Sequence, residues 1–179
     1  MLDRWCSSLL AYVRSVDSAI VIRRAGLADA DGLAEVHVGS WRAAYDGLLP
    51  QELLDGLSVP RRADAWRDMI ARGDGQTLVA VDASADRIVG LLNVGPSRDD
   101  DAGPEVGELR AIYLLPDRWN KGTGRLLHDA GFALLAPDFT VATLWVLDSN
   151  ERAKAFYAKR GWQVDGATKW DERGDAILT

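Results

Sequence analysis

The stretch Trp119-Asn-Lys-Gly-Thr-Gly124 constrains the fold of this chain more than any other. It lies between a β-rich run, residues 108–115, and a helical pattern, residues 124–136, so it predicts a turn that leads from a strand into a helix. The first N–H groups of a helix lack intrahelical partners, and the helix dipole adds partial positive charge there. Gly122 and Gly124 remove the Cβ atoms that would hold an anion off the backbone. The pattern therefore predicts an anion-binding turn, although two glycines also occur in turns that bind nothing.

Two common phosphate-binding loops do not fit these residues. A P-loop needs four spacer residues followed by Gly-Lys-Ser/Thr, whereas here Lys121 precedes Gly122. A Rossmann loop needs a third glycine, and Leu127 stands three positions after Gly124. It also needs an acidic residue at the end of the next strand, and none is evident there. Neither an NTPase nor a dinucleotide-binding domain is indicated.

Composition places the chain among soluble globular proteins. Of its 179 residues, 47% are hydrophobic and 27% are charged, which suits one domain with a substantial core. The net charge of −6 argues against a general nucleic-acid binder and would attract a cationic substrate such as an amine. One cysteine, Cys6, excludes an internal disulfide, and with two histidines, His37 and His128, it argues against a zinc site. We expect no metal and a reducing, cytoplasmic setting.

The first 19 residues are expected to be an appendage to a single domain that spans residues 20–179. Leu2, Trp5 and Leu9 recur at helical spacing, which predicts an amphipathic helix docked on the domain or on a partner. The apolar part, residues 7–13, is too short to span a bilayer and is not a convincing signal peptide. We expect no association with a membrane.

The remaining pattern predicts alternating strands and helices. Strands are expected at residues 20–24, 77–82, 87–94, 108–115 and 140–147, with a last hairpin formed by 162–170 and 175–179. Helices are expected after a cap at Asp29 or Asp31, within 50–71 with a break at Pro60, and at 124–136 and 151–160. The runs 77–82 and 87–94 predict an antiparallel hairpin, whereas the strand-helix-strand order of 108–147 predicts parallel pairing. The acidic segment 97–107 is expected to be a solvated loop without chemistry.

Several of these segments together resemble the GCN5-related N-acetyltransferase (GNAT) superfamily. The resemblance rests on Glu108-Leu-Arg-Ala-Ile-Tyr-Leu-Leu-Pro116, the glycine turn, Asn150, and the pair Phe156-Tyr157 followed by Gly161-Trp162. The tract from Ser40 to Pro50 is similar to the first-helix region of many bacterial members. The resemblance implies an α+β fold with a mixed, mostly antiparallel sheet flanked by about four helices. This sheet would splay between residues 108–115 and 140–147, with acetyl-CoA in the opening.

The same resemblance implies a set of cofactor contacts. The backbone of Ile112, Tyr113 and Leu114 would pair with the pantetheine amides. Residues of the turn, namely Asn120, Lys121, Gly122, Thr123, Gly124 and Arg125, would cradle the pyrophosphate. Asn150 would bind the pantetheine, cap the following helix, or do both. The family pattern has Gln or Arg three residues before the first glycine, where this chain has Trp119.

Acetyl transfer to an amine needs a neutral amine, a stabilised oxyanion and a proton for the departing thiolate. Tyr157 matches the usual proton donor of the family, and a phenol of pKa about 10 stays protonated at neutral pH. Its alternative role is a core aromatic beside Phe156. Glu108 is the candidate base, on a strand face that it is expected to share with Arg110 and Ile112. It could equally be a surface residue paired with Arg110, and an ordered water could take the proton instead.

The acceptor is expected to bind against the first two helices, where Trp41, Arg42 and Tyr45 are candidate contacts. Trp41 and Tyr45 could instead be core residues, and Arg42 could pair with an acidic neighbour. His37 is expected to be a core or rim residue. We therefore expect an N-acetyltransferase acting on a small-molecule or peptide amine, with a non-catalytic acyl-CoA-binding domain as the alternative. The short last strand suggests an open sheet edge that a second subunit could cover in a homodimer.

Overall fold

The computed structural model describes residues 20–171 and 176–179, so the predicted appendage, residues 1–19, lies outside the described residues. A five-stranded sheet has the order β1-β2-β3-β4-β5. Its strands are β1 (Ile20–Arg24), β2 (Gln76–Asp82), β3 (Arg87–Pro96), β4 (Val106–Leu114) and β5 (Val141–Thr143). Neighbours from β1 to β4 are antiparallel, and β4 pairs with β5 in parallel. The predicted mixed sheet, with its β2–β3 hairpin and its parallel crossover, is confirmed.

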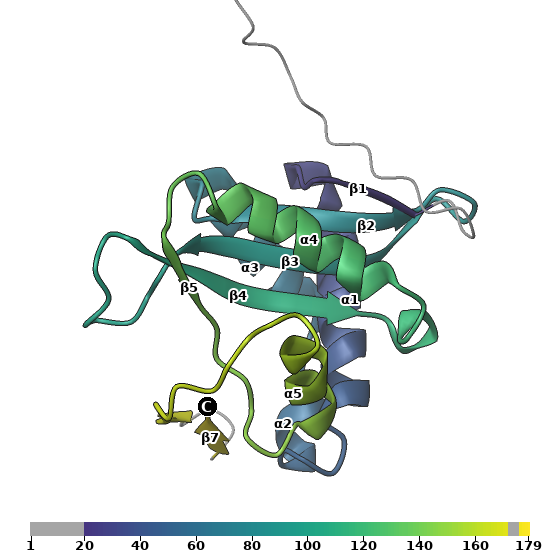
Figure 1. Ribbon diagram of the computed structural model, residues 1–179. Helices are drawn as coiled ribbons and strands as arrows, with labels where there is room; N and C mark the ends of the chain where they lie inside the picture. The colour runs from purple at the N-terminus through teal and green to yellow at the C-terminus, as the bar shows by residue number, and fades with distance from the viewer. Residues whose placement is uncertain (1–19, 172–175) are drawn as a thin grey trace, which may run out of the picture.

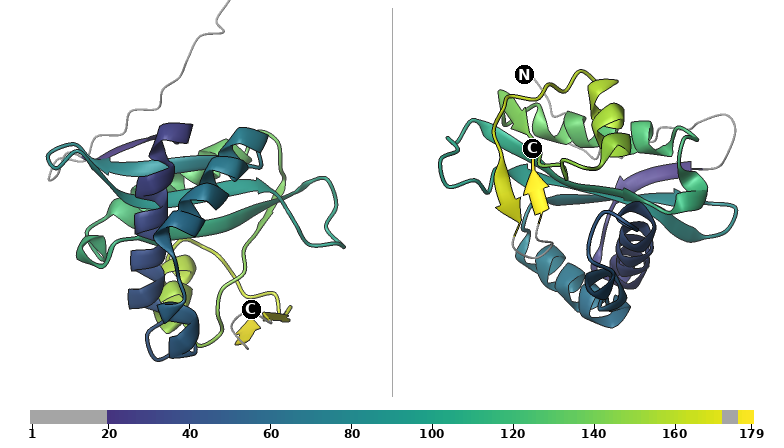
Figure 2. Two further views of the ribbon diagram at one scale, coloured as in Figure 1. Left: turned by 180° about the vertical axis from the view of Figure 1, so that it is seen from behind. Right: turned by 90° about the horizontal axis from the view of Figure 1, so that it is seen from below.

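Helices cover both faces of the sheet. They are α1 (Ala30–Ala44), α2 (Gln51–Asp55), α3 (Val59–Arg72), α4 (Thr123–Leu135) and α5 (Glu151–Ala158), with short 3₁₀ turns at Leu27–Asp29 and Pro116–Arg118. In Figure 1, α4 crosses the near face of the sheet while α1 and α3 lie behind it. Figure 2 shows α1 and α3 on one face and α4 and α5 on the other. None of the helices in the described ranges is long and apolar enough to cross a membrane.

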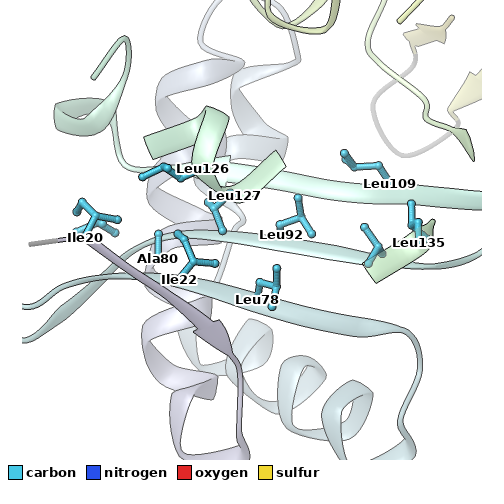
Figure 3. Close-up of a cluster of buried hydrophobic side chains, with 11 residues drawn as sticks. Ile20, Ile22, Leu78, Ala80, Leu92, Leu109, Leu126, Leu127 and Leu135 are labelled. Carbon is cyan, nitrogen blue, oxygen red and sulfur yellow. The ribbon is translucent and has the colours of Figure 1, made fainter. Parts of the chain in front are cut away.

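Side-chain alternation along the strands divides the core into two layers. Leu78 and Leu92 belong to the layer under α4, whereas Val79 and Leu91, their neighbours in sequence, belong to the layer under α1 and α3. Successive side chains of a strand point to opposite faces, so both faces of β2 and β3 are apolar. Figure 3 shows the α4 layer, in which Leu127 reaches down onto the central strands. Because both faces of these strands are buried, their sequences are nearly continuous apolar runs.

A β-bulge in β4 changes which residues share a face. Asn93 of β3 pairs with Ala111 and the next residue pairs with Leu109, so Arg110 is the extra residue on β4. Leu109 and Ile112, three apart, consequently both pack in the α4 layer, while Tyr113 packs against the opposite layer. The expectation that Glu108 and Ile112 share a face is therefore wrong. The bulge reverses the alternation between them.

The strand expected at 140–147 is shorter than predicted. β5 ends at Thr143, and the chain then leaves β4, because the backbones of Val146 and Thr179 exchange two hydrogen bonds of 2.9–3.0 Å. This divergence produces the predicted splay between β4 and β5. The splay turns the chain toward the C-terminal hairpin, which is separate from the main sheet.

The C-terminal hairpin is also shorter than predicted. It consists of β6 (Lys169–Asp171) and β7 (Ala176–Leu178), so residues 162–168 are not the expected strand. Gly161 and Gly166 adopt left-handed conformations at φ 85° and 91°. Between them the Trp162 indole donates to His128 of α4 over 2.9 Å. These turns and this anchor prevent extended pairing until residue 169.

Two expected helix boundaries also differ. The break in the region 50–71 falls before Pro60, because Ser58 caps α3 by accepting from the Arg61 N–H and the proline occupies the first turn, where it is tolerated. Asp29 is the N-cap residue of α1, but its side chain does not cap the helix. The Asp29 carboxylate instead accepts from Arg23 and from the N–H of Gly26.

Candidate functional site

A cleft of about 510 Å³ opens where β4 and the chain after β5 diverge. It is lined by the end of β4, the glycine turn and α5. The residues predicted to bind the cofactor or to donate the proton that line it are Ile112, Tyr113, Leu114, Asn120, Gly122, Gly124, Arg125, Asn150 and Tyr157. Lys121 and Thr123 are not among the lining residues, and Thr123 is buried. The structure thus brings most of the predicted cofactor residues to one cleft.

The glycine turn presents the start of α4 to this cleft. Gly122 is the N-cap residue at φ 86°, in the left-handed region that favours glycine, and no side chain caps the helix. The first N–H groups of α4 are therefore available to an anion. A Cβ at Gly122 would meet no protein atom within 4 Å, so this position is open toward solvent and the cleft. Asn120, at φ 57°, also adopts the left-handed conformation that asparagine tolerates.

Trp119 occupies the position where the family pattern has Gln or Arg. Its indole N–H donates to the Leu114 carbonyl over 3.0 Å, which fastens the turn to the end of β4. The Arg152 guanidinium lies over the Trp119 ring, 3.4 Å from its centroid, and both residues line the cleft. An aromatic side chain at this position therefore brings a cation from α5 beside the turn.

Asn150 and Tyr157 lie at the two ends of α5. The Asn150 side-chain oxygen accepts from the Ala153 N–H over 3.0 Å, so its predicted capping role is present, and the residue also lines the cleft. Tyr157 packs edge-on against Phe156 and Trp162, while its side chain lines the cleft. Desolvation, together with the nearby Tyr113 phenol, raises the pKa of the Tyr157 hydroxyl above its ordinary value. The phenol is thus held in its protonated form.

A second, smaller cavity of about 170 Å³ adjoins the cleft. Four residues line both spaces: Tyr45, Arg110, Tyr113 and Trp145. Trp41 and Tyr45, which pack edge-on with ring centroids 5.0 Å apart, form part of its wall. We call this cavity the acceptor pocket, after the role that is proposed for it below.

Two further predicted residues of α1 lie outside the acceptor pocket. The Arg42 guanidinium donates to the carbonyls of Leu54 and Leu57 at the end of α2, so it holds two helices together. His37 is buried among aromatic rings, with its centroid 4.8 Å from that of Tyr113 and 5.5 Å from that of Trp41. It supports the pocket wall from behind, in agreement with the predicted core role.

Glu108 lines the acceptor pocket but is neither exposed nor paired mainly with Arg110. Its carboxylate is 5% exposed and accepts three hydrogen bonds of 2.8–3.1 Å from Arg98, one from the backbone N–H and two from the guanidinium. The Arg110 Nε lies 3.9 Å away, while the rest of that guanidinium is bonded to Asp74 and to the Pro96 carbonyl. An ionised carboxylate offers about four acceptor sites, so one remains for a ligand or water.

The loop expected to lack chemistry contributes Arg98 to the lining of the acceptor pocket, and its Asp99 bonds to two other lining residues. Besides Arg98, its Asp99 carboxylate accepts from the Trp145 indole at 2.8 Å and from Lys169 of β6 at 2.9 Å. Burial opposes ionisation of Asp99, but the hydrogen bonds from Lys169 and Trp145 lower its pKa, so the carboxylate stays charged. Sequence reasoning missed Arg98, Asp99, Trp145 and Lys169. A run of three aspartates is typical of a solvated loop, and no local signal pointed to Lys169.

Comparisons with known proteins agree with this geometry. A model of the acetyltransferase (GNAT) family matches residues 41–162. The N-acetyltransferase YuaI of Bacillus subtilis is 35% identical over 132 residues, which are 73% of each chain. A probable N-acetyltransferase of Mycobacterium tuberculosis is 29% identical over 154 residues, 84% of each chain.

Among solved structures, the PaiA N-acetyltransferase from Thermoplasma acidophilum, crystallised with coenzyme A, superposes with a TM-score of 0.71. It is 22% identical, and the match covers 89% of this chain and 96% of that one. The ribosomal-protein-alanine N-acetyltransferase from Brucella melitensis gives a TM-score of 0.67 at 20% identity, with 88% and 95% covered. The fold, the splayed cleft and the matched sequence together place this chain in the GNAT family of N-acetyltransferases.

Proposed function

We propose that this protein transfers the acetyl group of acetyl-CoA to a small primary amine by direct attack in a ternary complex. The observation that carries the proposal is the junction of the two cavities, where Tyr45, Arg110, Tyr113 and Trp145 line both. A thioester in the cleft and an amine in the acceptor pocket would meet there. A structural neighbour of the chain binds coenzyme A, and the turn at Gly122 supplies an anion site for its pyrophosphate.

In the proposed reaction the amine nitrogen attacks the thioester carbonyl, and the C–S bond breaks as the amide forms. The Tyr157 hydroxyl, which its raised pKa keeps protonated at neutral pH, gives its proton to the departing sulfur. The ammonium proton of the acceptor passes to Glu108, or to a water that the remaining acceptor site of Glu108 orders. No covalent enzyme intermediate is formed.

Release of free thiol from acetyl-CoA in the presence of a panel of primary amines tests the proposal. We expect thiol release that depends on both acetyl-CoA and at least one amine. Saturable binding of acetyl-CoA without thiol release on any amine would contradict it, and would favour a non-catalytic acyl-CoA-binding domain instead.

Replacing Gly122 by alanine is expected to weaken acetyl-CoA binding by about tenfold, because a Cβ would enter the phosphate site. The left-handed conformation adds a strain of about 1–2 kcal/mol. Gly73→Ala is a matched control, since Gly73 is also left-handed at φ 65° and a Cβ there would likewise meet no atom within 4 Å. Calorimetric titration should show weaker binding in the Gly122 variant alone. Equal affinities in the two variants would remove the turn from the cofactor site.

Glu108→Gln is expected to slow transfer more for a strongly basic acceptor than for a weakly basic one. The α-amino group of a peptide, of pKa about 8, is partly neutral at physiological pH, whereas a lysine-type amine of pKa about 10.4 needs a base. We expect a loss of about 10²-fold in kcat/KM with the lysine-type amine and a smaller loss with the α-amine. Asp74→Asn, which removes the other carboxylate near Arg110, is the control. Equal losses for both acceptors would assign Glu108 a purely structural role.

A further inference from the structure

The acceptor pocket has an unusual charge for an enzyme that acts on amines. Among the described residues its lining holds three cationic side chains, Arg98, Arg110 and Lys169, and one carboxylate, Glu108. The carboxylates that pair with Arg110 and Lys169, namely Asp74 and Asp99, do not line it. The lining therefore holds more cationic than anionic side chains, each cation paired with one carboxylate, in a chain whose net charge is −6. The net charge of the whole chain predicts a cationic acceptor, whereas this lining favours an acceptor that carries an anionic group.

Two of these cations are placed to bind an anion. Arg98 and Lys169 come from different segments, and their side chains are 56% and 42% exposed. Two of the five Arg98 guanidinium donors go to Glu108, and one of the three Lys169 donors goes to Asp99. Both groups therefore have more donors than these contacts use. Because each is already held by a carboxylate, little rotamer freedom is left to lose on binding.

Lys169 is further fixed by an aromatic ring. Its Nζ lies 4.1 Å from the centroid of the Trp145 ring, while the Trp145 indole N–H donates to Asp99. Trp145 lines both the acceptor pocket and the cleft. Lys169 thus contacts a side chain that also lines the cleft in which the thioester would lie.

The rest of the pocket is small and apolar. Its volume of about 170 Å³ is below the 300–1,000 Å³ typical of sites for drug-sized ligands. Leu49 and Leu53 line it near α2, and Leu147 and Leu178 line it near the C-terminal hairpin. A polyamine would place charged groups against leucines and cations, at a cost in desolvation and repulsion.

We propose that the acceptor is an amine of amino-acid size that carries an apolar side chain and a carboxylate. This inference rests on the proposed function. The carboxylate would bind Arg98 and Lys169, the apolar side chain would contact the leucines, and the amine would face the junction with the cleft. The reaction is the acetyl transfer already described, with an α-amino acid as the nucleophile.

The test compares L-leucine with L-leucinamide, 3-methylbutylamine and spermidine in the thiol-release assay. Leucinamide keeps the apolar body but replaces the carboxylate by a neutral amide, and its amine loses a proton more readily. Leucine should nevertheless have a kcat/KM about tenfold or more above that of leucinamide, since a charge-assisted contact is lost in the amide. In Lys169→Met the leucine to leucinamide ratio should fall about tenfold. Arg67→Met, an ion-paired cation of α3 with 41% exposure, should leave the ratio unchanged.

The outcomes separate this inference from the proposed function. Turnover of leucinamide, 3-methylbutylamine or spermidine at rates equal to or above that of leucine would overturn the inference and leave the acetyltransferase proposal standing. A ratio unchanged by Lys169→Met would also overturn it. Thiol release with none of these amines, together with none in a wider panel, would overturn the proposed function and this inference with it.

Discussion

Tyr157→Phe is expected to lower kcat for acetyl transfer by about 10²–10⁴-fold, the usual contribution of a positioned general acid. The substitution removes only the hydroxyl, so the ring contacts with Phe156 and Trp162 remain. Affinity for acetyl-CoA should change by less than about twofold, because a group that acts on the departing thiolate contributes to the transition state more than to binding. Steady-state kinetics and calorimetric titration on the same preparation measure both quantities.

The pH profile of the wild-type enzyme supplies an independent readout of Tyr157. Because desolvation raises the pKa of its hydroxyl, the acid form persists to a higher pH than the ordinary value of about 10. Activity should therefore show no alkaline decline attributable to this residue below that pH. A Phe variant that keeps kcat within a few-fold of wild type would exclude Tyr157 as the proton donor and point to a water.

The second large effect is an acid destabilisation that originates at His37. Burial, with a smaller contribution from the charge of Arg62, lowers the pKa of His37 from 6.5 to about 3. Neither ring nitrogen has a hydrogen-bond partner in the described part of the chain. Below pH 6.5 the unfolded chain therefore binds a proton that the folded state does not, so stability falls as pH falls. The expected loss is about 1.4 kcal/mol per pH unit down to a pH of about 3.

Urea unfolding at several pH values tests this expectation. Between pH 7 and pH 5 the wild-type protein should lose about 2 kcal/mol of unfolding free energy through His37. His37→Phe keeps an aromatic ring against Trp41 and Tyr113 but cannot titrate, so its loss over the same range should be smaller by about that amount. Other groups, including His128, contribute equally to both proteins and cancel in the comparison. Identical pH slopes would show that the pKa of His37 is not lowered by folding.

Features that depend on neighbouring residues could be predicted from the sequence. The β2–β3 hairpin follows from two β-rich runs and a polar turn, and α4 follows from a glycine turn before an apolar helical period. The packing of Trp41 against Tyr45 follows from their spacing of four residues, which places them on one face of a helix. Each of these features follows from the spacing of residues that are close in the sequence.

Features that depend on contacts between residues distant in the sequence could not be predicted in this way. The sequence of β4 gives no sign of the bulge at Arg110, yet this bulge moves Ile112 to the face opposite Glu108. The partner of Glu108 is Arg98, ten residues away across a loop, rather than the nearby Arg110. Lys169 reaches Asp99 from 70 residues further along the chain. The homodimer suggested by the short last strand remains a prediction, which a light-scattering measurement of the molar mass in solution would test.

A crystal structure of the protein with bound coenzyme A tests the proposed cofactor site and its chemistry most directly. We expect the pyrophosphate to lie on the first N–H groups of α4, beside Gly122. We also expect the sulfur to lie within about 3.5 Å of the Tyr157 hydroxyl, at the junction with the acceptor pocket. Coenzyme A bound away from the glycine turn, or with its sulfur remote from both Tyr157 and the acceptor pocket, would contradict the proposed mechanism.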